Sequence, residues 1–173
     1  FDSSKNDAFI HVHKTELKGL VPIEASIKPS VSGTPTLLIR PKAFWAVGGF
    51  DEKADMTTDW EFCARFCHHW KVDHGPESLV NVYFNHMYDR LSTQMRYNKA
   101  YLKKRIAMHE YYLEEFHDTF DKRSGSRWYN YKSLAFFCLK DRDVLKTIKY
   151  SYLFVVNYIK NSLYEKRNES GKS

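Results

Sequence analysis

One carboxylate of this chain, Asp59, has the setting that proton transfer requires. It belongs to the run Thr57-Thr-Asp-Trp-Glu-Phe62, in which Thr58 and Glu61 have the spacing of a helix start. The amide dipoles of a first helical turn favour the ionised form of a carboxylate, and a general base must be ionised to accept a proton. Asp59 is therefore a candidate base for a hydroxyl group. The alternative is a carboxylate that only caps the helix.

A glycine-rich turn, Gly48-Gly-Phe-Asp-Glu52, precedes Asp59 and follows the apolar segment Thr36-Leu-Leu-Ile-Arg40. The order of these pieces over residues 30–95 resembles the acceptor-side half of an inverting family 2 glycosyltransferase with a GT-A type fold. That resemblance implies that Asp59 is the catalytic base. It also implies that the acceptor is bound by Trp60, Gly48, Gly49, Phe50, Asp51 and Thr58. Thr58 stands where the family commonly has an acidic residue, and burial in the core is the alternative for Trp60.

Further along the chain, His86 and Ser92 loosely match a family segment near the donor phosphates; the arginine of that segment is absent from its place, and Arg90 is a substitute for it. The resemblance implies that His86, Arg90 and Ser92 bind these phosphates and that His86 also contacts a metal ion. A structural histidine is the alternative for His86. The family's Asp-x-Asp metal motif lies before the base, whereas Asp141-Arg-Asp143 lies after it and reads as a helix N-terminus.

The reaction implied by the resemblance is a direct displacement with inversion. Asp59 would deprotonate an acceptor hydroxyl, which attacks the anomeric carbon of a nucleotide sugar, most simply a UDP-sugar. The acceptor would be a glycan or a lipid-linked sugar of polysaccharide or cell-envelope biosynthesis. A divalent cation, Mn²⁺ or Mg²⁺, would neutralise the leaving diphosphate. Because the chain begins at Phe1 and has no early Asp-x-Asp, we expect a fragment without its metal and nucleotide half, inactive by itself.

A group of cysteines and histidines suggests a second kind of chemistry, zinc binding. Structural zinc sites pair two closely spaced cysteines with a second pair far along the chain, and the third cysteine here, Cys138, stands alone. We therefore expect buried free thiols, and the odd number of cysteines favours a reducing, cytosolic setting. The group consists of Cys63, Cys67, His68, His69 and His74.

The elements that would position these residues are predicted to form an α/β fold over residues 1–90, part of a GT-A-like mixed sheet. Short apolar runs predict strands, and a proline start with a paired-glycine stop predicts a short helix between Pro41 and Gly48. Another helix is expected from Thr58 to Trp70, with an apolar face and a Glu61–Arg65 pair. The predicted strands are residues 8–12, 34–40 and 80–86.

Residues 91–173 are predicted to be a basic α-helical extension. The apolar spacing indicates helices over residues 92–116, 128–138 and 144–163, a loop at residues 122–126 and a disordered tail from residue 165.

The charge of the chain divides at the same place. Residues 1–89 carry 9 Lys/Arg and 12 Asp/Glu, net −3, and residues 90–173 carry 18 and 9, net +9. The basic half could contact an anionic membrane surface, which would place the enzyme in the cytoplasm and on the inner face of the cell membrane. A nucleic acid partner is not expected for the enzyme. It belongs to the alternative function, a non-catalytic module that binds an acidic partner, a nucleic acid or a membrane through the basic helices.

Overall fold

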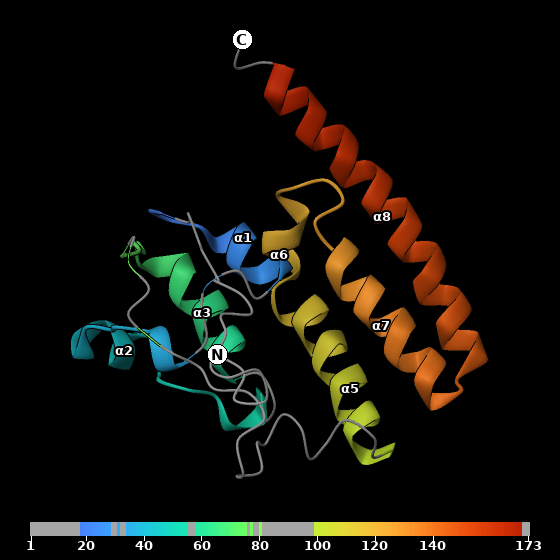
Figure 1. Ribbon diagram of the computed structural model, residues 1–173, viewed down its shortest axis with the longest axis horizontal. Coiled ribbons are helices and arrows are strands. Elements are labelled where there is room, and N and C mark those ends of the chain that lie inside the picture. Colours follow the sequence, from blue (N-terminus) through green and yellow to red (C-terminus); the bar gives the residue numbers. More distant parts are fainter. Residues whose placement is uncertain are drawn as a thin grey trace, which may run out of the picture.

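The described part of the chain is built from helices (Figure 1). The computed structural model describes residues 18–28, 31, 34–54, 58–75, 77, 80 and 99–170. Their helices, in chain order, are α1 (Pro22–Ile27), the 3-10 turn η2 (Thr34–Thr36), α2 (Pro41–Ala46), η3 (Glu52–Ala54), α3 (Thr58–His69), α5 (Lys99–Glu115), α6 (His117–Asp121), α7 (Trp128–Asp141) and α8 (Val144–Ser170).

The predicted mixed sheet is wrong for these residues, which contain no strand. Their β-pairing is limited to an isolated antiparallel bridge between Gly19 and Val72. The predicted strand at 34–40 is instead the turn η2 followed by an irregular segment in which Leu38 is 102% exposed. Pro35 lacks a backbone donor, and Leu37 N bonds locally to Thr34 O at 3.2 Å. The predicted strand at 8–12 and residues 81–86 of the third lie outside the described residues.

Helices α1 and α3 share an aromatic core with α5 and α6. The indole of Trp60 stacks on the ring of Tyr112, with centroids 4.3 Å apart, and its Nε1 donates to Ala25 O at 2.8 Å. Both rings are buried. Helices on both sides of the predicted division at residue 90 therefore contribute to one core. The buried members of this core are Ile27, Trp60, Ala64, Met108, Tyr112, Phe116 and Phe120.

Helices α5, α7 and α8 lie side by side and alternate in direction (Figure 1). The chain reverses between α7 and α8 at Arg142, whose φ of 64° is left-handed. Asp143 Oδ1 then accepts a bond from Lys146 N at 3.0 Å, so Asp143 caps α8, as the sequence indicated. Helix α8 continues to Ser170 and so includes residues 165–170 of the predicted tail.

The loop before α7 anchors the middle of α8. Gly125 has a φ of +75°, and a Cβ built there would lie 2.3 Å from both Asn157 O and Asn161 N. Arg123 Nη2 adds an ion pair to Glu165 at 2.7 Å. Among the described residues, no helix combines the length and apolar composition needed to cross a membrane.

Candidate functional site

The glycine-rich turn is built by the end of α2. Gly48 N donates to Trp45 O at 3.0 Å and Gly49 N to Phe44 O at 3.1 Å, the two bonds of a Schellman motif. Both glycines have positive φ, 82° and 68°, which confirms the predicted paired-glycine stop. The ring of Phe50 then packs edge-on against that of Phe44, with centroids 5.4 Å apart. The turn thus has a defined conformation.

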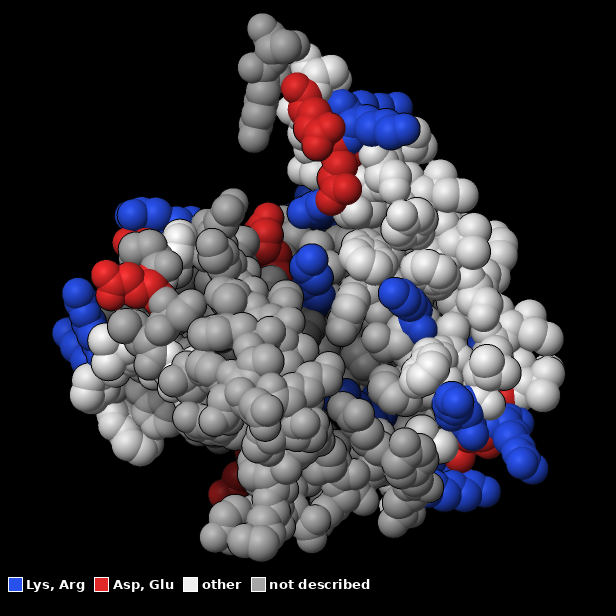
Figure 2. Space-filling model, viewed as in Figure 1, with Lys and Arg blue, Asp and Glu red and all other residues white. Residues whose placement is uncertain are grey.

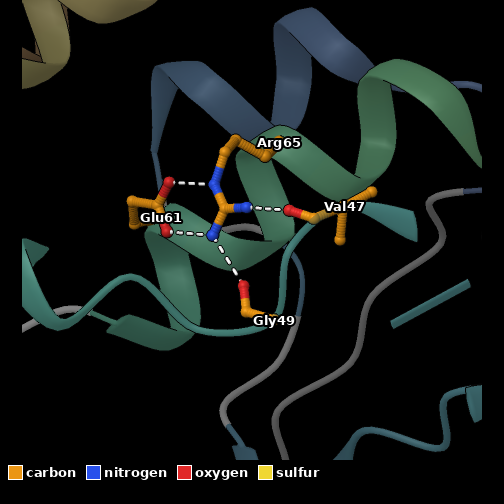
Figure 3. A network of polar contacts seen from close by, with 4 residues as sticks. All are labelled: Val47, Gly49, Glu61 and Arg65. Atoms are coloured by element: carbon orange, nitrogen blue, oxygen red, sulfur yellow. Dashed lines mark hydrogen bonds and ion pairs between the residues drawn. The ribbon is translucent and has the colours of Figure 1, made fainter. Parts of the chain in front are cut away.

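A buried ion pair from α3 holds this turn in place (Figure 3). Arg65 donates through Nε and Nη2 to the two carboxylate oxygens of Glu61, the latter at 2.7 Å. Its Nη1 donates to Val47 O, and its Nη2 also donates to Gly49 O at 2.8 Å. The Glu61 side chain is 0% exposed, and hydrogen bonding to it raises the pKa of Arg65. The predicted Glu61–Arg65 pair is confirmed, and it also links the turn to the helix that carries Asp59.

The turn forms one wall of an open cleft of about 490 Å³, a size within the range of small-molecule sites. Helix α5 contributes the opposite wall. Carboxylates dominate the polar lining, so the cleft favours neutral or cationic groups over a diphosphate. The cleft is lined by Gly48, Phe50, Asp51, Glu52, Arg65, Tyr111 and Glu115.

Tyr111 supplies a hydrogen-bond donor to the cleft. Burial raises the pKa of its phenol to about 12, with further contributions from Glu115, Glu61 and Asp51, against an opposing effect of Arg65. The phenol is therefore protonated at neutral pH. Carboxylates that accept hydrogen bonds, a phenol that donates one and the exposed ring of Phe50 are the groups that bind sugar hydroxyls and a sugar face.

Asp59 lies at a second, smaller pocket of about 160 Å³ between α3, α5 and α7. The residue is in the first turn of α3, where Trp60 N donates to its Oδ1 at 2.8 Å. The pocket is lined by Asp59, Trp60, Arg105, His109, Tyr129, Ser133 and Phe137.

Two basic side chains of α5 face this pocket. Burial lowers the pKa of His109 to about 4, so its ring is neutral at pH 7, and its Nδ1 donates to Asn130 Oδ1 at 2.9 Å. The guanidinium of Arg105 lies over the rings of Tyr101 and Phe137, 5.7 and 5.4 Å from their centroids. Its Nε is buried and has no hydrogen-bond partner among the described residues. Arg105 therefore brings a positive charge to the pocket that contains Asp59.

The structure separates the predicted site residues into two groups. Gly48, Phe50 and Asp51 line the cleft, whereas Asp59 and Trp60 line the smaller pocket. Gly49 is buried behind the turn, and Thr58 is half-buried at the start of α3. Trp60 is only 5% exposed, with one ring face against Tyr112. The predicted donor residues, His86, Arg90 and Ser92, lie outside the described residues.

The cysteines of α3 are buried and not bonded to one another. Burial raises the pKa of both Cys63 and Cys67 to about 12, so they are thiols at neutral pH. His68 Nε2 bonds to Thr119 Oγ1 at 3.1 Å. In the part of the chain that the structure describes, no three His, Cys, Asp or Glu side chains are grouped to hold a metal ion. These residues do not fit the divalent metal that the resemblance implies.

Sequence reasoning did not identify Arg105, His109, Tyr111 or Glu115 as site residues. All four lie on α5, more than forty positions after Asp59, and no local motif distinguishes them from other helix residues. Only the packing of α5 on α3 brings them to the two cavities. No protein-family model, curated protein or solved structure matches this chain.

Proposed function

We propose that this chain supplies the acceptor side of an inverting glycosyl transfer. The observation that carries the proposal is the link through Arg65, which joins the glycine-rich turn to the helix that presents Asp59. The glycine-rich turn and the helix start with Asp59, which together suggested the activity, are therefore joined by hydrogen bonds from Arg65. The proposal requires neither a mixed sheet nor a metal ion within the described residues.

The cleft beside the turn is the proposed site of the acceptor sugar. Its carboxylates, Asp51, Glu52 and Glu115, accept hydrogen bonds from hydroxyl groups, and protonated Tyr111 donates one. The exposed ring of Phe50 offers an apolar surface to the sugar face. A nucleotide diphosphate is a poor ligand for the same cleft because its charge has the same sign as the carboxylates.

Asp59 is the proposed base. Because its pocket is separate from the cleft, the proposed acceptor is a glycan of at least two sugars, with its reacting hydroxyl in the pocket and another sugar in the cleft. The carboxylate takes the hydroxyl proton while the oxygen bonds to the anomeric carbon, and the bond to the departing diphosphate breaks. Arg105 lines the same pocket as Asp59, and its positive charge would stabilise negative charge that develops on the leaving oxygen. His109 is neutral and would orient the hydroxyl.

Acceptor binding is tested with this chain alone. Methyl glycosides of glucose, galactose, mannose and N-acetylglucosamine serve as probes in saturation-transfer difference NMR. Tyr111→Phe and Glu115→Gln should each weaken the signal of a bound glycoside, whereas Glu114→Gln, one position away and exposed, should not. If all three variants gave the same signal as the parent chain, the cleft would not be the acceptor site.

The catalytic role is tested with the polypeptide that carries this sequence together with the donor half that the resemblance implies. UDP release from UDP-sugars is measured in the presence of an acceptor that binds. Asp59→Asn should lower kcat by about 100-fold or more and leave UDP affinity unchanged, since loss of a general base typically costs that much. Asp118→Asn, an exposed aspartate of α6, is the matched control. Full activity of Asp59→Asn would refute the proposal.

A second candidate function is a non-catalytic interaction module. The observation that favours it is a row of exposed apolar side chains that runs along most of α8. Binding through that row would be indifferent to Asp59→Asn. The two functions are compatible in one polypeptide, so they are tested separately.

A further inference from the structure

Helix α8 carries two apolar faces, and the protein uses only one of them for packing. Tyr150 and Asn161 are buried toward α7 and the loop before it, with Leu153 half-buried between them. The exposed set recurs at intervals of three and four residues, which places it along one side of the helix. The outer face of α8, as we call this set, consists of Leu145, Ile148, Tyr152, Val155, Ile159 and Leu163.

This outer face points away from the core. Tyr150 and Asn161 lie on the side of the helix roughly opposite the exposed row, given about 100° per residue. The exposure is large: Leu145 is 82% and Tyr152 69% accessible. The row extends over about 27 Å, from residue 145 to residue 163. A continuous apolar surface of this length on a protein marks an interaction site.

Between positions 144 and 164, α8 carries basic side chains and no acidic ones. Residues 144–164 contain Lys146, Lys149 and Lys160 and no Asp or Glu. Lys149 and Lys160 are exposed and follow the row along one edge, each about one helical turn from an end of the row. At the corner where α8 begins, Lys140 and Arg142 are balanced by Asp141 and Asp143, so the positive border is confined to the length of the helix itself. Figure 2 shows uncharged side chains along the outer edge of α8, with charged side chains of both signs at its two ends.

We propose that the outer face of α8 docks on an anionic membrane surface, with the helix lying in the plane of the interface. An apolar row with a basic edge on one helix is the combination that such helices use: the row inserts below the headgroups and the lysines contact anionic lipids. The proposal goes beyond the transfer activity and does not depend on it. It would place the two cavities close to a lipid-linked substrate.

The same charge pattern disfavours a second copy of this chain as the occupant. Two outer faces packed together would bring Lys149 and Lys160 of each copy toward those of the other, with no acidic residue between positions 144 and 164 to pair with them. Like charges in such a contact are destabilising. A membrane with anionic lipids supplies the complementary charge.

The test measures cosedimentation of this chain with vesicles of phosphatidylcholine, with and without phosphatidylglycerol. We expect binding that needs phosphatidylglycerol and weakens as salt is raised. Lys149→Glu with Lys160→Glu should lower the partition constant by at least about 25-fold, from about fivefold for each lysine lost. Lys42→Glu, an exposed lysine of α2, is the matched control.

The apolar row is tested with Ile148→Gln and Ile159→Gln, each compared with Leu38→Gln, an exposed leucine outside α8. Only the α8 variants should weaken binding, and their far-UV circular dichroism should match that of the parent chain because both side chains are exposed. A dye on Val155→Cys should shift to the blue on anionic vesicles, and the same dye on Leu38→Cys should not. The three native cysteines are buried and do not compete for the label.

Two results would overturn the proposal. One is absence of binding to phosphatidylglycerol vesicles at low salt, or binding that the α8 variants leave unchanged. The other is a dimer in sedimentation equilibrium that Ile148→Gln converts to a monomer, which would assign the outer face to a second copy of the chain. Neither result bears on glycoside binding in the cleft.

Discussion

Replacing Arg65 by methionine should be the most disruptive single change near the proposed acceptor site. The methionine keeps an apolar stem of similar length but removes the charge and every donor. It leaves the Glu61 carboxylate, 0% exposed, without its cation, and it removes the donors to Val47 O and Gly49 O. The perturbation therefore acts both on a buried charge and on the position of the glycine-rich turn.

The expected magnitude follows from these two effects. Removing one partner of a buried ion pair costs about 3–5 kcal/mol because the other charge remains buried. Arg65→Lys should cost less, about 1–3 kcal/mol, because an ammonium group can still pair with Glu61 but cannot also reach both turn carbonyls in the same geometry. Against a typical folding free energy of about 5–15 kcal/mol, the loss in Arg65→Met is easily measured.

A double-mutant cycle separates the ion pair from other effects of the substitution. Glu61→Gln with Arg65→Met removes both charges and should cost about 2 kcal/mol less than the sum of the two single variants. Urea unfolding, followed by circular dichroism and tryptophan fluorescence, gives the free energies. Hydrogen exchange of residues 44–52 reports on the turn itself and should become faster in Arg65→Met.

Arg40→Met, at an exposed arginine before α2, is the control and should stay within about 0.5 kcal/mol of the parent chain. Additivity of Glu61→Gln and Arg65→Met to within about 0.5 kcal/mol would show that the two side chains are not coupled in solution. Unchanged hydrogen exchange in the turn would show that Arg65 does not hold it. Either result would refute the role given to this network.

Three further predictions concern the helices behind the site. Gly125→Ala should cost about 2–5 kcal/mol in urea unfolding, because its Cβ would meet the backbone of Asn157 and Asn161 and its φ is positive; a loss under 1 kcal/mol would contradict the close approach. The pKa of His109 is lowered to about 4 in the folded state, so between about pH 4 and pH 6.5 the unfolded chain binds a proton that the folded chain does not. The contribution of neutral His109 to stability is therefore complete above about pH 6.5 and is lost as the pH falls toward 4. That loss is about 2 kcal/mol between pH 7.5 and pH 5, and His109→Gln should show a correspondingly smaller pH dependence of unfolding. Arg142→Gly should raise the free energy of unfolding by about 0.5–1 kcal/mol by relieving a left-handed φ of 64°, and no gain in thermal unfolding would count against that strain.

Much of the helical structure follows from local chemistry, and the sequence predicts it well. Pro41 and the glycine pair delimit α2, and the apolar spacing in α3, α5, α7 and α8 marks each as a helix. These signals are local because a helix satisfies its own backbone hydrogen bonds. The Glu61–Arg65 pair is equally local, since side chains four residues apart share a helix face.

The predicted strand at 34–40 failed because a short apolar run does not distinguish a strand from other structure. A strand exists only if another segment pairs with it, and the described residues contain no strand that could pair with residues 34–40. The resemblance to a sheet-containing family suggested such a partner. Residues with a proline at each end instead formed a turn and an exposed segment.

The sequence by itself determined helices α2, α3, α5, α7 and α8, the stop at Gly48 and Gly49, the position of Asp59 in a first turn and the Glu61–Arg65 pair, because each depends on residues a few positions apart. Only the tertiary structure decided that Arg65 reaches the glycine-rich turn, that Asp59 and the turn face separate cavities, and that Tyr111 and Arg105 complete them. These relations join residues many positions apart. They depend on which helix packs on which, and that choice is made by side-chain shape and burial over the whole core rather than by any local spacing.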